Sequence, residues 1–445
     1  MNRVKPVVFF IILTVMSGVA AAQPWSLQQC IDYALEHNIN VQQKALSQES
    51  EEYNLRIAKY SMLPNLNAGV GQSFDFGRST NREGVIIDQN SSSTSFSLSS
   101  NMPLFSGMRI YHQIKSGKSN LRAAMEDLSK AKDDLELNII SAFLSILFNK
   151  ELLGVARTQV SLTDEQVTRI EKMVEVGRSP QSELYEAKAL LAQDEFSVVQ
   201  CENTLRLSLL DLAQLLELSD VSGFEVVDPQ VDDATLSHFT TLLNADTTFH
   251  RALLFRPEIK AAQYRLEGSK HDLRTMQSYY YPSLSLQAGY SNGYYHLNGK
   301  EYSQVPQDPF WDQLNLNNRE YVGFNLSIPI FNRLEVSSRV KMARLNIDQQ
   351  TLQLENTRKT LLKEIQQAYY NAVAAQQKFE ASKKSITASE EAFRYAEERY
   401  AAGRGTNFEF NDAKTRLIKA QSDLLQAKYE YLFRCRILDF YNSPE

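Results

Sequence analysis

The chain has 445 residues, a formal net charge of −6 at pH 7, and 22% charged residues. A negative net charge without a basic stripe argues against nucleic acid as a partner. The six histidines are dispersed and no HExxH motif occurs. The sequence therefore predicts no metal site, no cofactor and no catalytic centre, and we expect no enzymatic activity.

The first 22 residues have the pattern of a secretory signal peptide. Arg3 and Lys5 precede an apolar run from Val7 to Val15, and Ala20-Ala21-Ala22 offers a small-residue cleavage site. No later stretch has about 18 consecutive apolar residues, so no transmembrane helix is expected. The three scattered cysteines, Cys30, Cys201 and Cys435, do not form a disulfide scaffold. Packed or free thiols are favoured, and a Cys201–Cys435 bridge stays open.

A helix is predicted over 26–60 and ends before Pro64. Four later stretches, at about 66–76, 94–104, 284–294 and 321–330, alternate between apolar and small polar residues. A period of two predicts strands. Their length, about 9–11 residues, is what a tilted strand needs to cross a bilayer. Taken alone, the four strands would fit two hairpins of a soluble sheet at least as well.

Each pair of strands is followed by a predicted long helical hairpin, at about 106–218 and 332–441. In the second hairpin, apolar or small residues recur every seventh position from Val340, and a second column runs from Ile365 to Tyr400. This a/d heptad pattern is typical of a long helix packed in a coiled coil. At 1.5 Å per residue the stretch 332–401 would reach about 105 Å. Gly177 and Gly403 mark the two hairpin tips.

The two halves of the chain are a tandem repeat. Gly177-Arg178 matches Gly403-Arg404 at an offset of 226, and the heptad columns keep their phase across that offset. Upstream, Pro64-Asn65-Leu66 matches Pro282-Ser283-Leu284 at an offset of 218. An offset that stays constant within each of these segments is the signature of internal repetition, and the eight-residue difference indicates an insertion between the two strands of a pair. The predicted domains after the signal peptide are repeat 1 at 23–220, an equatorial connector at 221–251 holding short strands or helices, and repeat 2 at 252–445.

Four strands cannot close a barrel, and open strand edges are not tolerated in hydrocarbon. Barrels begin at about eight strands, so the chain must associate with copies of itself. Two copies would give eight strands around a plugged interior, whereas three would give twelve strands around a lumen, beside twelve long helices. The predicted fold class is mainly α with β: a trimeric α-barrel of antiparallel coiled-coil helices and a 12-stranded transmembrane β-barrel.

With these elements in order, the chain resembles the TolC family of outer membrane efflux proteins. The resemblance rests on Leu63-Pro64-Asn65-Leu66 and Tyr281-Pro282-Ser283-Leu284 before the first strand of each hairpin, and on Met102-Pro103-Leu104-Phe105 and Ile328-Pro329-Ile330-Phe331 between strand and helix. It implies a homotrimer in outer membrane lipid with a periplasmic extension. It also implies a passive exit duct of a tripartite efflux or type I secretion system, docked to an inner-membrane pump through a periplasmic adaptor protein.

The glycines at the hairpin tips can be explained by the turns alone, because glycine adopts a positive φ without steric cost. The resemblance also implies functional roles for the residues at these tips. Adaptor docking is implied for Val176, Gly177, Arg178, Ala402, Gly403, Arg404 and Gly405. A periplasmic gate or constriction is implied for Glu409, Asp412, Tyr400, Ser182 and Glu183. Glu409 and Asp412, spaced i, i+3, share a helix face, so a threefold axis would gather six carboxylates. The family's arginine falls at Gly405 here, which puts the gate's ion-pair lock in doubt.

We expect the resting trimer to be closed at the tips and to dilate when the adaptor docks. The alternative function is a soluble, secreted coiled-coil scaffold with an ordinary sheet. Within the channel interpretation, the sequence does not separate drug, metal and protein as cargo.

Overall fold

The computed structural model describes residues 24–80, 84, 86–88, 90–221, 223–227, 244–298 and 306–442. The predicted signal peptide and much of the predicted connector lie outside these residues. The chain forms two compact units. One unit contains Gln42–Ala131 and Asp246–Ile365, which include the sheet, and the other contains the hairpin segments on either side of both tips.

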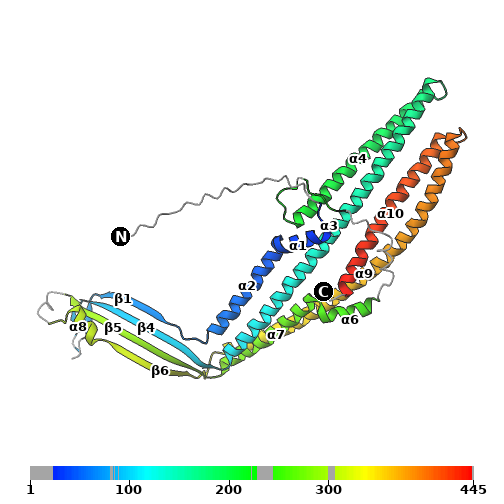
Figure 1. Cartoon of the computed structure of the whole chain (residues 1–445). Helices are drawn as coiled ribbons and strands as arrows, with labels where there is room; N and C mark the ends of the chain where they lie inside the picture. Colours follow the sequence, from blue (N-terminus) through cyan, green and yellow to red (C-terminus); the bar gives the residue numbers. More distant parts are fainter. Residues whose placement is uncertain are drawn as a thin grey trace, which may run out of the picture. The chain divides into compact units, whose positions relative to one another are not determined.

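The sheet is antiparallel, with strand order β1-β4-β5-β6 (Figure 1). Its strands are β1 (Asn67–Asp75), β4 (Asn90–Ser106), β5 (Ser283–Asn298) and β6 (Arg319–Ser327). Between β1 and β4 lies a short hairpin of β2 (Arg78–Thr80) and β3 (Ile86–Asp88). Because β4 pairs with β5, the strand pairs of the two repeats join into one sheet.

The register gathers the apolar side chains on one face. Val70 lies opposite Phe96, and Leu286 lies between Met102 and Phe324. On the other face small residues pair, as in Gly69 opposite Ser97. The alternation with period two predicted from the sequence is confirmed, since side chains along a strand point to opposite faces in turn.

Two strands are longer than predicted. β4 has 17 residues and β5 has 16, and their pairing continues to Asn90 opposite Asn298. The serine-rich start of β4 lies outside the predicted strand at 94–104 because it lacks apolar alternation, but pairing with β5, and with β1 from Ser91 onward, holds it in the sheet. β6 stops at Ser327, short of the predicted residue 330, because Pro329 has no N–H for the ladder.

The predicted helix over 26–60 is two helices, α1 (Leu27–His37) and α2 (Ile39–Tyr60). Asn38 interrupts them with an extended backbone conformation. Its side-chain oxygen accepts hydrogen bonds from the backbone N–H of Asn40 and Val41, and its amide donates to the carbonyl of Leu215 at 3.0 Å. Asn38 thus caps α2, a local preference that outweighs the continuous helical pattern.

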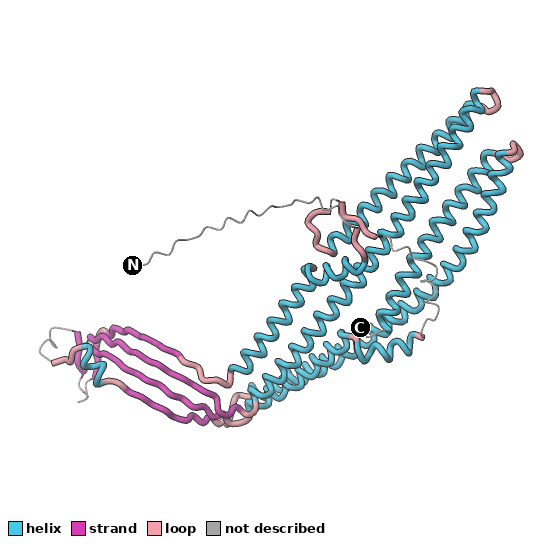
Figure 2. Tube along the Cα trace, in the orientation of Figure 1, coloured by secondary structure: helices cyan, strands magenta, loops and turns pink. Residues whose placement is uncertain are grey.

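The repeat is visible in the element boundaries. The long helices are α3 (Arg109–Glu175) and α9 (Glu335–Ala401), each of 67 residues, and the return helices are α4 (Gln181–Leu215) and α10 (Asn407–Asn442) (Figure 2). Two left-handed residues precede each long helix: Gly107 and Met108 before α3, with φ of 61° and 67°, and Arg333 and Leu334 before α9, with φ of 52° and 62°. The same offset relates both sets.

Upstream, α6 (Ala245–Phe255) and α7 (Pro257–Gln277) are the counterparts of α1 and α2, so helix begins inside the stretch predicted as connector. A 3₁₀ turn, η1 (Ser278–Tyr280), leads into β5. The seven-residue α8 (Phe310–Leu316) was not predicted, because it is too short to show a period. The side-chain amide of Gln313 bonds both backbone groups of Tyr295, which fixes α8 to β5.

The heptad columns form the core of the long helices. Leu361, Ile365, Ala368, Ala372 and Phe379 are all buried, as the a/d pattern predicts. By length and composition alone, α3 contains one stretch apolar enough to span a membrane. In the single chain 33% of that stretch is buried, and Ile139, Phe143 and Ile146 of the same helix are among its buried residues.

The three cysteines are free thiols, so the Cys201–Cys435 bridge that the sequence left open is not formed. Cys30 and Cys435 are buried, and burial raises the pKa of each thiol to about 11. Both thiols are therefore protonated packing residues at neutral pH.

Candidate gate and docking site at the helix tips

Both hairpin tips use the same backbone turn. Gly177 and Gly403 have φ of 67° and 71°, a left-handed conformation that glycine adopts without steric cost. The N–H of Gly403 donates to the carbonyl of Tyr400 at 3.1 Å, and the N–H of Arg404 donates to Arg399 at 2.9 Å. Gly177 and Arg178 make the same pair of bonds to Val174 and Met173. Each long helix therefore ends in a Schellman motif.

The residues for which docking was predicted cluster at these two turns. Val176 is 69% exposed, and Gly177, Arg178, Ala402, Gly403 and Arg404 are also exposed. Gly405 differs, because its N–H bonds the carbonyl of Arg399 at 3.1 Å and an added Cβ would lie 3.1 Å from the Tyr400 nitrogen. A side chain at position 405 would therefore need the backbone around Tyr400 to shift by a few tenths of an ångström.

Glu409 also caps the start of α10, a role that the sequence did not predict. Its carboxylate accepts the backbone N–H of Thr406 at 3.3 Å, while the Thr406 hydroxyl accepts the N–H of Glu409 at 3.2 Å. This reciprocal pair is a capping box that starts α10. The same carboxylate lies 3.4 Å from Arg399. Asp412 pairs with Arg416 at 2.9 Å, so both predicted constriction carboxylates carry an arginine beside them.

Tyr400, from the second hairpin, packs flat against Phe410, with ring centroids 5.1 Å apart. Burial raises the pKa of its phenol, the nearby charge of Glu183 raises it further, and Arg169 opposes them. Glu183 belongs to the first hairpin, so the structure brings these two predicted gate residues into electrostatic range. The Glu183 carboxylate accepts the hydroxyl of Ser179, and the neighbouring Ser182 is exposed.

The sequence did not predict a set of buried and partly buried polar residues that lies between the hairpins. We call it the polar seam, and it comprises Gln159, Thr163, Gln166, Asp194, Asn407 and Lys414. Lys414 is 2% exposed, and its ammonium group donates to the Thr163 hydroxyl at 2.6 Å. Thr163 donates to the carboxylate of Asp194, which also accepts the Gln159 amide at 3.1 Å. The Gln166 amide donates to Asn407 at 2.7 Å.

The seam connects α3 and α4 of the first hairpin to α10 of the second. Burial lowers the pKa of the Lys414 ammonium group, and the charge of Asp194 opposes that shift. A signal existed in the sequence: Gln159, Thr163 and Gln166 follow one another at spacings of four and three, so polar residues occupy one helix stripe. The sequence gives no signal for the burial of Lys414. The same residue type stands at the equivalent position of the first repeat, where Lys188 is exposed and pairs with Glu171 at 3.0 Å.

Comparison with known proteins agrees with this architecture. Residues 30–217 and 248–436 match the family described as Outer membrane efflux protein. The outer membrane protein TolC of Salmonella enteritidis is 24% identical over 444 residues, covering 97% of this chain and 84% of that protein. The alkaline protease secretion protein AprF of Pseudomonas aeruginosa is 21% identical over 422 residues, covering 92% of this chain and 82% of that protein.

Solved structures share the fold. The outer membrane protein VceC of Vibrio cholerae superposes with a TM-score of 0.74 at 16% identity, covering 94% of this chain and 96% of VceC. The CmeC outer membrane channel of Campylobacter jejuni gives a TM-score of 0.76 at 19% identity, covering 94% of this chain and 85% of CmeC.

The repeated strand and helix hairpins, together with these matches, give this chain the same fold as these outer membrane proteins. The chain belongs to the Outer membrane efflux protein family. The protein is located in the outer membrane, and the alternative of a soluble secreted scaffold is not supported.

Proposed function

We propose that this protein is the outer-membrane exit duct of a tripartite efflux or type I secretion system, a passive conduit gated at its periplasmic helix tips. The family match supports this proposal, as do relatives that include a toluene efflux pump component and a protease secretion protein. Both kinds of relative leave the cargo class of this chain open.

The edges of the sheet support assembly as a trimer. β1 and β6 are its outer strands, each has nine residues, and neither has a partner on its outer side within the described chain. Lipid does not tolerate open strand edges, and strands of equal length can pair along their full extent. We infer that β6 of one copy pairs with β1 of the next, and that three copies close a twelve-stranded barrel.

For the gate, we propose that three copies of Glu409 and Asp412 surround the axis and select cations. Tyr400 of the second hairpin lies in electrostatic range of Glu183 of the first, Ser182 is next to Glu183 in the chain, and we propose that these three residues change their contacts on opening. The polar seam adds a restraint, since sliding one hairpin past the other would break the bond between Lys414 and Thr163. Docking of a periplasmic adaptor, itself joined to an inner-membrane pump, would supply the energy of opening.

We propose that the adaptor docks on the two exposed tip turns, Val176-Gly177-Arg178 and Ala402-Gly403-Arg404-Gly405. The observation that carries this proposal is the identical Schellman geometry of the two tips. In a trimer it would present six similar turns to a partner, in keeping with a ring-shaped docking surface.

Single-channel recording in planar bilayers tests the constriction without disturbing the fold. Glu409→Gln removes the charge but keeps a side chain able to close the capping box, and Asp412→Asn is nearly isosteric. We expect the double variant to change conductance and lower cation selectivity. A matched control is Glu52→Gln, which removes an equally exposed carboxylate paired with Arg56 on α2. If the double variant behaves as the control does, the constriction lies elsewhere.

A further inference from the structure

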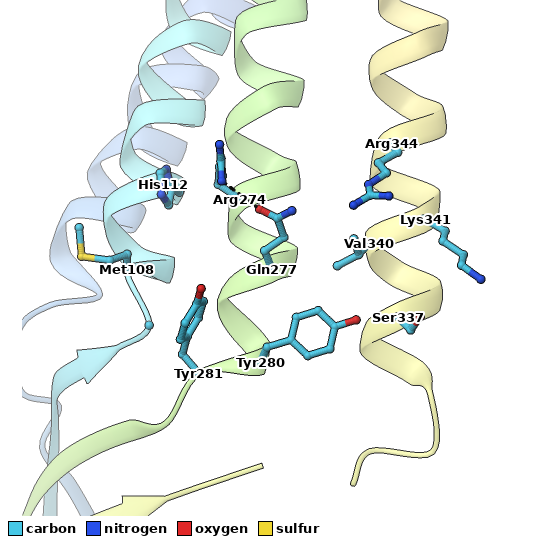
Figure 3. Close-up of a pocket in the computed structure, with 11 residues that line it drawn as sticks. Met108, His112, Arg274, Gln277, Tyr280, Tyr281, Ser337, Val340, Lys341 and Arg344 are labelled. Atoms are coloured by element: carbon cyan, nitrogen blue, oxygen red, sulfur yellow. Dashed lines mark hydrogen bonds between the residues drawn. The ribbon is translucent and has the colours of Figure 1, made fainter. Parts of the chain in front are cut away.

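A cavity of about 590 Å³ lies where the strands meet the helices, between the start of α3, the end of α7 and the start of α9. Figure 3 shows the three helices and the lining side chains, of which Lys341 points away from the space between them. The cavity is lined by Gly107, Met108, His112, Arg274, Gln277, Tyr280, Tyr281, Ser337, Val340, Lys341 and Arg344. All of these residues belong to the unit that contains the sheet.

The lining carries positive charge without a compensating carboxylate. Arg274, Lys341 and Arg344 line the cavity, and none of the three forms an ion pair with a carboxylate in the part of the chain that the structure describes. Arg274 makes a 3.4 Å contact with the oxygen of Gln277, a neutral acceptor. Asp272 and Asp348 lie on the same helices but do not line the cavity. The guanidinium groups of Arg274 and Arg344 are therefore left for an external anion to neutralise, while Lys341 adds charge at the rim.

The lowered pKa of His112 is consistent with positive charge around the cavity. Its ring stacks on His271 with centroids 5.6 Å apart. Burial lowers the pKa of the His112 imidazole, and the neighbouring charges of His271 and Arg274 lower it further. Positive neighbours disfavour a further proton, and the same neighbours favour an anion.

The donors around the cavity are arranged for an anion of several oxygens. In Figure 3, Arg344 reaches from α9 toward Arg274 and Gln277 on α7, and Tyr280 extends toward Ser337. Guanidinium groups bind phosphate through paired N–H donors in a plane, and the amide and hydroxyl groups can complete its coordination. The backbone passes close to Gly107 at this end of the cavity, because a Cβ added there would lie 2.6 Å from the Ser278 carbonyl oxygen.

The position along the chain indicates where such an anion would come from. Gly107 follows the last residue of β4, and Tyr281 lies two residues before β5. Tyr279, Tyr280 and Tyr281 are 40%, 48% and 60% exposed, and exposed aromatic residues at the ends of membrane strands mark the level of the lipid headgroups. With the strands crossing the outer membrane, the cavity lies at the depth of headgroup phosphates on the helical side.

We propose that this cavity is a binding site for a phosphate group, supplied either by an anionic phospholipid headgroup or by free phosphate. Arg274 and Arg344 are its principal ligands, and Lys341 at the rim adds charge. The proposal rests on the proposed function in one respect: the strands must cross the membrane for a lipid to reach the site. Occupancy would brace the three helices where they join the barrel.

The test uses the full-length protein purified in neutral detergent. Native mass spectrometry counts phosphatidylglycerol bound to the assembly, with phosphatidylcholine as the neutral comparison, and ³¹P NMR titration with inorganic phosphate measures free-anion binding. We expect saturable binding of phosphatidylglycerol, weakened about tenfold or more in Arg274→Gln and in Arg344→Gln. Arg344→Lys, which keeps the charge but loses the planar donors, should retain intermediate affinity. The matched control is Arg358→Gln, an exposed arginine on the same helix outside the cavity.

The outcomes distinguish a lipid ligand from a soluble anion, and either of these from the absence of a site. Phosphatidylglycerol binding that depends on both arginines identifies the lipid as the source, whereas binding of inorganic phosphate alone identifies a soluble anion. Equal binding by the cavity variants and the Arg358→Gln control, or no phosphate binding at all, overturns the site. The same preparations are reconstituted in planar bilayers: a channel that conducts yet binds no phosphate sinks this inference alone, while protein that never forms a channel speaks against the proposed function.

Discussion

The ammonium group of Lys414 donates a 2.6 Å hydrogen bond to the hydroxyl of Thr163, and these residues come from different helical hairpins. Fully buried lysines are rare unless they are partnered, and here Thr163 passes the interaction on to the carboxylate of Asp194. The bond ties the two hairpins at the polar seam. It also makes the stability of the seam measurable by substitution.

Thr163→Val keeps the shape of the side chain but removes the only oxygen that accepts from Lys414 among the described residues. A buried ammonium group without an acceptor should destabilise the protein by about 1–3 kcal/mol. Adding Lys414→Met removes the charge as well, and Asp194 keeps its bond from Gln159. The double variant should therefore recover most of the loss. Thermal unfolding followed by circular dichroism measures each step, and additive losses would contradict a direct coupling.

Lys414 also predicts how stability depends on pH. In the unfolded chain the lysine titrates near its ordinary pKa of 10.5, whereas burial lowers the pKa in the folded protein. Between the lowered value and 10.5 the unfolded state binds more protons, so stability conferred by this group rises with pH. The melting temperature of the wild type minus that of Lys414→Met should increase as pH is raised from neutral toward 10.5. A difference that stays flat or falls would show that the lysine is not held in a desolvated site.

A side chain at the tip glycine Gly403 is expected to strain the turn. Gly403→Ala must place a Cβ on a residue with φ of 71°, which costs about 1–2 kcal/mol. Hydrogen exchange of peptides around 403 should become faster as the turn loosens. Gly154→Ala is the control, since it lies inside α3 where an added Cβ meets no atom within 4 Å. That change should slow local exchange, because alanine favours helix over glycine by about 0.5–1 kcal/mol. Equal behaviour of the two variants would refute the turn argument.

The two faces of the sheet should respond differently to charge. Phe324 lies on the apolar face and is 72% exposed in the single chain, while Asn325 lies on the opposite face. Phe324→Arg places a cation in lipid at a cost of about 2–4 kcal/mol near the bilayer midplane. We expect it to reduce folding into liposomes and the yield of heat-resistant oligomer on gels, and we expect Asn325→Arg to do neither. Similar yields for both would mean that the apolar face does not meet lipid.

Much of the fold could be predicted because its signals are local. The heptad columns from Val340 and Ile365 predicted the long helices, because residues spaced three, four and seven apart lie on the same face of a helix. The alternation around Val70 fixed a strand by the same logic. Gly177 and Gly403 indicated the turns, and the constant offset between the two hairpins indicated the repeat.

The features that the sequence did not predict depend on contacts between segments that are distant in the chain. The serine-rich start of β4 is a strand only because β1 and β5 pair with it, and Asn38 ends α1 while reaching across to Leu215. The family resemblance implies a constriction role for Glu409, and the structure shows that its carboxylate also forms the capping box of α10 with Thr406, from the next turn of the chain.

The sequence by itself determined the kind, order and duplication of the elements, because backbone periodicity and turn chemistry are written in neighbouring residues. Only the tertiary structure decided that Lys414 is buried whereas its repeat counterpart Lys188 lies in solvent, and that Arg274 and Arg344 line one cavity from separate helices. Burial and electrostatic partnership depend on which surfaces meet in space, and two copies of the same local pattern acquire different environments when they pack against different neighbours.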